Sequence, residues 1–196
     1  STGELRSEGN FNDNIRHGVW KYYFPSGQLE QTGSFRNGQE DGLWTWYYDD
    51  GSLRREENYY RGREDGPSVE YAKTAQVIAK GEFIEGMEEG EWYYHVGDHT
   101  EKGVFKGGEK DGVWMHYYLD ESKKFSGAFI QGYANGKHRY YYESGSIKED
   151  QYFEMGRREK LWKKYDEEGN IIISINYSND RIVRINGIKV NLEEIE

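Results

Sequence analysis

Histidine and aspartate side chains gather in one stretch of the sequence and offer the donor set of a metal site. His95, Asp98 and His99 lie close together, and His116 follows in the next stretch of similar sequence. Imidazole and carboxylate groups are common zinc ligands. However, His95 and His116 occupy positions that the repeat described below fills with aromatic side chains, and His99 lies in a turn. Because two histidines and an aspartate without fixed spacing often occur by chance, we expect no metal site and no cofactor.

The remaining residue types form no catalytic motif. The chain has no Cys, which excludes disulfides, thiolate metal ligands and a cysteine nucleophile. Its serines lie mostly in turns, and no Gly-x-Ser-x-Gly sequence is present. The Gly-Gly-Glu-Lys sequence at 107–110 lacks the spacing of a phosphate-binding loop and its Ser or Thr. We therefore expect a protein that is not an enzyme.

Acidic side chains recur just before a series of regularly spaced glycines. They are Glu40, Asp41, Glu64, Asp65, Glu88, Glu89 and Asp111. If each repeat adds two strands to a sheet, neighbouring acidic positions lie about 10 Å apart along one edge. That distance is about one Debye length at physiological salt, so the repulsion is tolerable while the fields add. The pattern predicts an acidic ridge that steers a basic protein partner; the alternative is that these residues only keep the turns soluble.

Aromatic residues are unusually frequent, with 18 Tyr, 8 Phe and 6 Trp making up 16% of the chain. This content argues against disorder, although charged residues reach 32%. Most of the aromatic side chains are needed for the core of a thin sheet. Trp and Tyr are also favoured at binding hot spots. Candidate contact residues are therefore the aromatics that depart from the repeat: Trp46, Tyr60, Tyr118 and Tyr133.

A repeat of about 24 residues must position these side chains. A glycine two residues before a large aromatic recurs, as in Gly42-Leu43-Trp44, and the anchors lie at positions 18, 42, 66, 90, 112, 136 and 160. A second column of Tyr, with His95 as its exception, follows five residues after each anchor, and a third column of Phe or Tyr runs from Phe11 to Tyr177. Three columns in one register establish seven repeats. One repeat is two residues shorter, in the segment 95–100.

Each repeat has the pattern of a β-hairpin. An aromatic run such as residues 43–48 suits a first strand, a turn with its own glycine follows, and a second strand runs from an aliphatic residue to the Phe or Tyr column. The Trp and Tyr columns lie three residues apart and therefore point to opposite faces. The pattern predicts an all-β fold, in which a repeat array of antiparallel hairpins forms one elongated twisted sheet.

The ends of the chain differ from the repeats between them. We assign residues 1–177 to the hairpin array and residues 178–196 to a C-terminal β cap within the same domain. Residues 171–177 and 181–185 have strand patterns, and Asn186-Gly187 predicts a two-residue hairpin turn before a strand at 188–192. Residues 1–10 are expected to pair with the first repeat or to fray.

The segment from Asn37 to Leu53 resembles the MORN repeat, and more closely the bacterial MORN-variant repeat. It shares Asn-Gly at 37–38, Gly-x-Trp at 42–44, Tyr-Tyr at 47–48 and Gly-x-Leu at 51–53. The resemblance covers roughly residues 9–180; Ser68 and His138 depart from it in the Trp column, and Lys160 in the glycine column. It implies an elongated hairpin sheet that binds proteins or, in some eukaryotic members, membranes. The bacterial family is widely labelled an antitoxin or immunity component, and it supplies no catalytic residues.

Charge narrows the class of partner. The net charge is −10, which disfavours nucleic-acid binding because that binding depends on Lys and Arg. An acidic face is also repelled by anionic lipids, so a membrane-associated MORN scaffold is a second alternative only. The first alternative to a protein-binding scaffold is an envelope or surface module that is structural or binds glycans. We expect a cytoplasmic location, with export or an envelope location left open because the sequence begins at Ser1 without Met.

Overall fold

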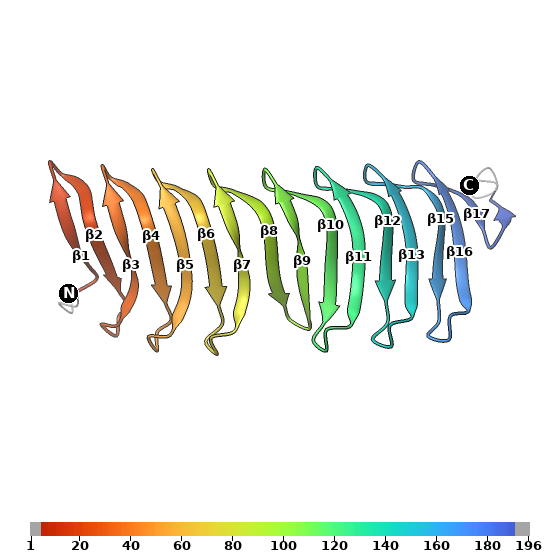
Figure 1. The fold of residues 1–196 in the computed structure, drawn as a ribbon, viewed down its shortest axis with the longest axis horizontal. Coiled ribbons are helices and arrows are strands. Elements are labelled where there is room, and N and C mark those ends of the chain that lie inside the picture. The colour runs from red at the N-terminus through yellow and green to blue at the C-terminus, as the bar shows by residue number, and fades with distance from the viewer. Residues whose placement is uncertain (1–4, 191–196) are drawn as a thin grey trace, which may run out of the picture. The chain divides into compact units, whose positions relative to one another are not determined.

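The computed structural model describes residues 5–190, and these residues form strands and turns without a helix. The chain falls into two compact units, unit 1 at residues 1–95 and unit 2 at residues 96–196. Both units are built from consecutive antiparallel hairpins (Figure 1). The predicted all-β hairpin fold is therefore confirmed. No helix among residues 5–190 has the length and apolar character that a membrane span requires.

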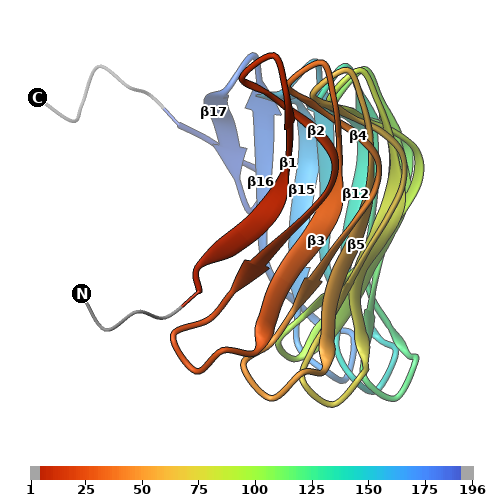
Figure 2. The same ribbon diagram turned by 90° about the vertical axis from the view of Figure 1, so that its left-hand side faces the viewer.

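Unit 1 is an antiparallel sheet in which each strand pairs with the next along the chain. Its first strand covers part of the segment that was expected to pair with the first repeat, and residues 1–4 lie outside the described residues. The strands bend along their length (Figure 2). Their bounds are β1 (Ser7–Asn12), β2 (Ile15–Tyr23), β3 (Leu29–Arg36), β4 (Gln39–Tyr47), β5 (Leu53–Tyr60), β6 (Arg63–Tyr71), β7 (Val77–Ile84) and β8 (Met87–Val96).

Unit 2 is built in the same way, except that β13 pairs with both β14 and β15, and it ends in shorter strands. Strand β16 pairs with β17, and β17 pairs with β18, at the place of the predicted C-terminal hairpin. That hairpin strand was expected to reach residue 192, but residues 191–196 lie outside the described residues. The bounds are β9 (His99–Lys106), β10 (Glu109–Tyr118), β11 (Lys123–Ile130), β12 (Tyr133–Tyr141), β13 (Ile147–Glu154), β14 (Arg157–Arg158), β15 (Lys160–Tyr165), β16 (Ile171–Ser178), β17 (Arg181–Ile185) and β18 (Ile188–Lys189).

Two-residue turns fix the register of the hairpins at one end. Between β3 and β4, Asn37 and Gly38 have φ values of 53° and 79°. Positive φ at both central residues is the requirement of a type I′ turn, which matches the twist of the flanking strands. Glycine and asparagine tolerate this conformation, which explains why the glycine of this turn recurs with the period of the repeat.

The core of most hairpin steps is a tryptophan that lies over a glycine of the preceding strand. A Cβ atom on Gly33 would lie 2.1 Å from Cδ2 of Trp44, far closer than two non-bonded carbon atoms can approach. The strand register shifts between Thr32 and Ser34, so Gly33 lies at an irregularity where the indole can fold over the backbone. Tryptophan and glycine form the same pair elsewhere in both units: Gly9 with Trp20, Gly81 with Trp92, and Gly103 with Trp114.

The indole nitrogens repeat a second contact. Nε1 of Trp20, Trp92, Trp114 and Trp162 each donates a hydrogen bond to the carbonyl ten residues earlier, at 2.9–3.2 Å. His138, which stands in the Trp column, makes the equivalent contact from Nε2 to Ala128 O at 2.7 Å. Burial lowers the pKa of His138, so this ring is neutral and can replace an indole.

One repeat replaces the tryptophan–glycine pair with a polar pair. Ser68 stands in the Trp column, and Glu57 stands where five of the repeats have glycine; both are buried. Glu57 accepts hydrogen bonds from Ser68 Oγ at 3.3 Å and from Tyr59 Oη at 2.8 Å. Because the smaller side chain leaves room for the larger one, the two substitutions compensate each other.

Candidate binding surface

A shallow groove of about 320 Å³ lies on unit 1 over strands β2–β5. Its lining includes Arg16 and Tyr22 from β2, Glu40 and Trp46 from β4, and Tyr59 from β5. Trp44 forms part of the floor and is only 4% exposed. Side chains two residues apart on a strand share a face, which is why Trp44 and Trp46 both reach the groove.

Edge-to-face and tilted ring contacts hold the floor of the groove together. The ring centroids of Phe35 and Trp44 are 5.1 Å apart at an interplanar angle of 88°, and those of Trp44 and Trp46 are 6.1 Å apart. Tyr59 continues the row at 6.3 Å from Trp46. Such pairs stabilise by about 0.5–1.5 kcal/mol beyond their buried area. The groove is therefore a preformed aromatic surface rather than a flexible one.

Charged side chains border this aromatic floor. The guanidinium of Arg16 lies 5.0 Å from the ring centroid of Trp20, and that of Arg55 lies 4.2 Å from the ring centroid of Trp46. Burial, followed by the hydrogen bond to Glu57, raises the pKa of Tyr59, so this hydroxyl stays protonated. The groove thus combines cation–π pairs, a neutral phenol and the carboxylate of Glu40.

Comparison with known families identifies the repeat. The profile described as MORN repeat variant matches residues 16–37, 40–59, 134–155 and 158–179. This is a MORN-repeat protein. The matched segments lie in both units, and residues 60–133 between them fold into hairpins of the same kind.

Other comparisons of this MORN-repeat protein give weaker likenesses. No curated protein shows significant sequence similarity to the chain. A structure titled "Crystal structure of GtfA/B complex bound to UDP and GlcNAc" is similar over 58% of this chain and 23% of its own, at 14% identity and a TM-score of 0.33. One titled "Crystal Structure of TcdB2-TccC3-Cdc42" is similar over 89% of this chain and 14% of its own, at 11% identity and a TM-score of 0.17. The MORN-repeat chain thus spans under a quarter of the length of either structure.

The predicted acidic positions of unit 1 occupy equivalent places in successive hairpins. Glu40, Glu64 and Glu88 lie opposite Phe35, Tyr59 and Phe83 in the strand register. Each step crosses two strands, which corresponds to about 10 Å. Asp111 lies in unit 2, opposite Val104. The structure therefore aligns the acidic residues of unit 1 as the repeat predicts.

These carboxylates are half-buried, and several make contacts within the protein. Asp41 Oδ2 pairs with Arg36 at 2.9 Å, and Glu88 Oε1 accepts a hydrogen bond from Tyr94 Oη at 2.6 Å. Asp65 Oδ2 accepts one from the backbone nitrogen of Glu85 at 3.4 Å. Glu89 is also half-buried, in β8 beside Glu88. The acidic row of unit 1 therefore stabilises the hairpins as well as shaping the electrostatic field.

The four predicted contact aromatics lie in different surroundings. Trp46 lines the groove, while Tyr60 and Tyr133 flank two-residue turns and are 52% and 57% exposed. Tyr118 donates a hydrogen bond to Tyr141 O at 2.9 Å. Tyr48 and Tyr142 make the same contact, each with a backbone carbonyl of the next hairpin step. This tyrosine position therefore joins adjacent repeats. A tyrosine six residues after the anchor is the sequence signal for that role.

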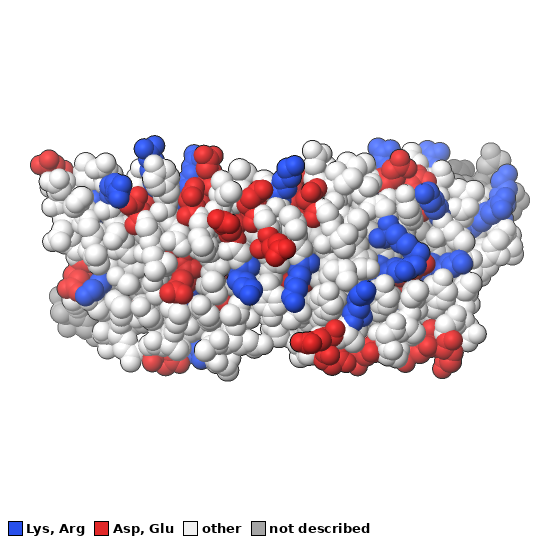
Figure 3. All heavy atoms as spheres, in the orientation of Figure 1, with Lys and Arg blue, Asp and Glu red and all other residues white. Residues whose placement is uncertain are grey.

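The two units hold equal numbers of acidic residues but differ in net charge. Residues 1–95 contain 18 Asp and Glu against 10 Lys and Arg, whereas residues 96–196 contain 18 against 16. Unit 1 thus carries −8 of the net charge of −10. On the face drawn in Figure 3, basic side chains gather over β12–β16 of unit 2, and acidic side chains lie on both units. Most of the net negative charge and the aromatic groove therefore belong to the same unit.

Proposed function

We propose that this MORN-repeat protein is a non-enzymatic scaffold that binds a basic partner protein on unit 1. The observation that carries the proposal is the aromatic groove over β2–β5, bordered by Glu40, in the unit that holds most of the net negative charge. Aromatic anchors supply affinity at protein interfaces, while complementary charge speeds association and selects the partner. The bacterial resemblance makes an antitoxin or immunity protein the most concrete form of this function.

The groove favours a protein partner over a glycan. A sugar ring stacks on an open aromatic face, but Arg55 lies over the ring of Trp46 at 4.2 Å. A guanidinium in that place can instead pair with a carboxylate or a backbone carbonyl of a protein. The negative charge of unit 1 also opposes binding to anionic membranes.

The test is retention of partners on the immobilised chain from an extract of its native source, at low and high salt, read by mass spectrometry. We expect one basic protein that is retained at low salt and released at high salt. The variants Glu40→Gln and Trp46→Tyr should each reduce its retention about fivefold or more, which corresponds to about 1 kcal/mol at a hot spot. Tyr22 and Tyr140 stand at the position equivalent to Trp46, so Trp46→Tyr preserves the fold.

The matched control is Glu154→Gln, which removes an exposed carboxylate from β13 in unit 2. It should retain the partner like the unchanged chain. Equal retention by Glu40→Gln, Trp46→Tyr and the unchanged chain would show that the groove is not the binding surface. Recovery of polysaccharide without protein would favour the envelope module instead.

A further inference from the structure

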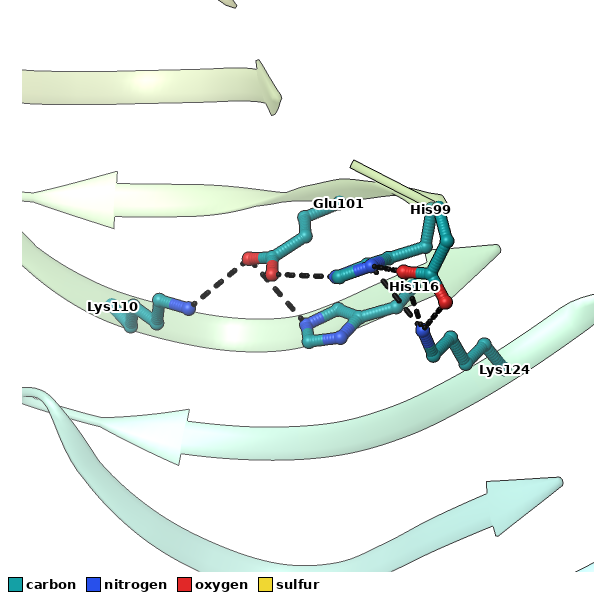
Figure 4. A network of polar contacts seen from close by, with 6 residues as sticks. His99, Glu101, Lys110, His116 and Lys124 are labelled. Atoms are coloured by element: carbon teal, nitrogen blue, oxygen red, sulfur yellow. Dashed lines mark hydrogen bonds and ion pairs between the residues drawn. The ribbon is translucent and has the colours of Figure 1, made fainter. Parts of the chain in front are cut away.

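Three side chains on adjacent strands of unit 2 converge on one point (Figure 4). His99 and Glu101 lie two residues apart on β9, and His116 lies opposite Glu101 in the register of β10. Glu101 Oε1 is 3.1 Å from His99 Nε2, and Glu101 Oε2 is 3.6 Å from His116 Nε2. One ligand atom from each residue lies within 4.8 Å of the other two.

We infer that His99, Glu101 and His116 form a binding site for a divalent transition-metal ion, with zinc as its representative. Zinc binds imidazole nitrogen and carboxylate oxygen at about 2.0–2.2 Å, which places tetrahedral ligand atoms about 3.3 Å apart. The distances from the Glu101 oxygens to the two histidine nitrogens, 3.1 Å and 3.6 Å, lie on either side of that value. Two histidines and one carboxylate leave a fourth position for water, as in sites that keep one open coordination place.

The first support is an unsatisfied nitrogen. His116 Nε2 is buried and has no hydrogen-bond partner among the described residues, although it points toward Glu101. At 3.6 Å this nitrogen lies too far from the carboxylate oxygen for a hydrogen bond. A cation between the two groups would satisfy both.

The second support is the outer partner of His99. His99 Nδ1 lies 2.8 Å from Asp98 Oδ1, and Lys124 Nζ contacts the same carboxylate at 3.1 Å. If Nδ1 donates its hydrogen to Asp98, the Nε2 lone pair is directed toward Glu101. A carboxylate that orients a ligating imidazole in this way is the usual outer partner of a metal-bound histidine.

Two lysines occupy the surroundings of the site. Lys110 Nζ lies 3.7 Å from Glu101 Oε2 and also 3.8 Å from the ring centroid of Trp114. An incoming metal ion would displace this ammonium from Glu101, and the tryptophan ring already offers it an alternative contact. Lys124 Nζ lies 3.3 Å from His99 Nδ1, on the side of the ring away from Glu101, where it holds Asp98 in place.

The third support is that the repeat does not require these histidines. His99 stands where other repeats have an aliphatic residue, namely Leu29, Leu53, Val77, Ile147 and Ile171. His116 stands where several have an aromatic residue, namely Tyr22, Trp46, Tyr94 and Tyr140. From the sequence alone we expect no metal site, because two histidines and an aspartate without fixed spacing often occur by chance, and the candidate carboxylate there is Asp98. In the structure His95 instead contacts Gln76 in unit 1, and Glu101 takes the place of the carboxylate ligand.

The experiment is calorimetric titration of zinc chloride into the full chain, without a histidine tag and after treatment with a chelator. We expect one site per chain. His99→Leu and His116→Tyr should abolish binding at that site, and both variants restore residues that other repeats carry at these positions. Asp98→Asn should weaken binding about 10–100-fold, as expected for an outer partner. The control His95→Gln should bind like the unchanged chain.

Circular dichroism of each variant checks that the sheet is intact, and two independent consensus variants keep the test decisive if one misfolds. Absence of zinc binding by the unchanged chain would overturn the proposal. Unaltered zinc affinity and stoichiometry in a folded His99→Leu or His116→Tyr variant would overturn it as well. Spectra of a cobalt-substituted chain supply a second readout, because coordination to nitrogen changes the visible absorption of Co²⁺.

Discussion

Replacing Gly33 with alanine tests the tryptophan–glycine pairing that builds the core. Gly33 lacks a positive φ, so the backbone itself accepts alanine, and the loss of unfolded-chain entropy would favour the variant by about 0.4–1 kcal/mol. The added Cβ would however lie 2.1 Å from Trp44 Cδ2. The ring must move by more than 1 Å to reach ordinary contact at about 3.5 Å. The steric clash therefore outweighs the entropic gain, and the variant is expected to be less stable than the unchanged chain.

The magnitude follows from what Trp44 loses when it moves. Overpacking a core typically costs about 1–3 kcal/mol. Displacing the ring also weakens its contacts with Phe35 and Trp46, each of which contributes about 0.5–1.5 kcal/mol. After the entropic gain is subtracted, we expect Gly33→Ala to destabilise unit 1 by about 2–4 kcal/mol. That is a large fraction of the stability of an ordinary domain.

The assay is urea denaturation followed by circular dichroism, combined with hydrogen exchange to locate the loss. Exchange should accelerate in β3 and β4 first, because repeat arrays depend on nearest-neighbour contacts. Trp44→Ser provides the second arm of a double-mutant cycle, since Ser68 occupies the equivalent position in the next repeat. In that background Gly33→Ala should cost little. A cost below about 1 kcal/mol in the unchanged chain, or an equal cost in both backgrounds, would refute the steric argument.

Two further predictions concern a turn and a buried histidine. Gly38→Ala should lower the free energy of unfolding by about 1–2 kcal/mol, because φ is 79° and the new Cβ would lie 3.0 Å from Ile15 Cγ2. Thermal denaturation measures this loss. An unchanged melting temperature would contradict the type I′ assignment. The pKa of His116 is lowered from 6.5 to about 4 by burial, with Glu101, Lys110, His99 and Lys124 facing it, so the unfolded chain binds the proton first as the pH falls. As the pH falls from 7.5 to 5, the metal-free chain should therefore lose about 1–2 kcal/mol of stability, and the His116→Tyr variant should not. Urea midpoints at both pH values measure this difference. An identical pH dependence in the two proteins would argue against a neutral buried His116.

Much of the hairpin architecture could be predicted from local sequence. The turn at Asn37-Gly38 is specified by residues that tolerate positive φ, and the alternation of Trp44 and Trp46 assigns them to one face. The repeat also predicted the alignment of Glu40, Glu64 and Glu88, because equal spacing in sequence becomes equal spacing across paired strands. These features depend only on the period and on short-range geometry.

The pairing of Gly33 with Trp44 could have been noticed, since Gly9, Gly33, Gly81, Gly103 and Gly127 follow the repeat two residues before the Phe or Tyr column. The physical reason for this pairing could not be predicted from the sequence. An indole lies over this backbone only because the register shifts beside Gly33, and such shifts depend on two strands at once. The hydrogen bond from Tyr118 to the carbonyl of Tyr141 likewise joins adjacent repeats.

The sequence by itself determined the hairpin, its period, its turns and the family to which it belongs, because those properties are encoded within each 24-residue unit. Only the tertiary structure decided which side chains meet. It placed Glu101, and not His95, beside His99 and His116, and it gathered the aromatic floor and Glu40 into one groove on unit 1. Cross-strand register sets these contacts, and a shift of one residue would turn the same side chains to the opposite face of the sheet.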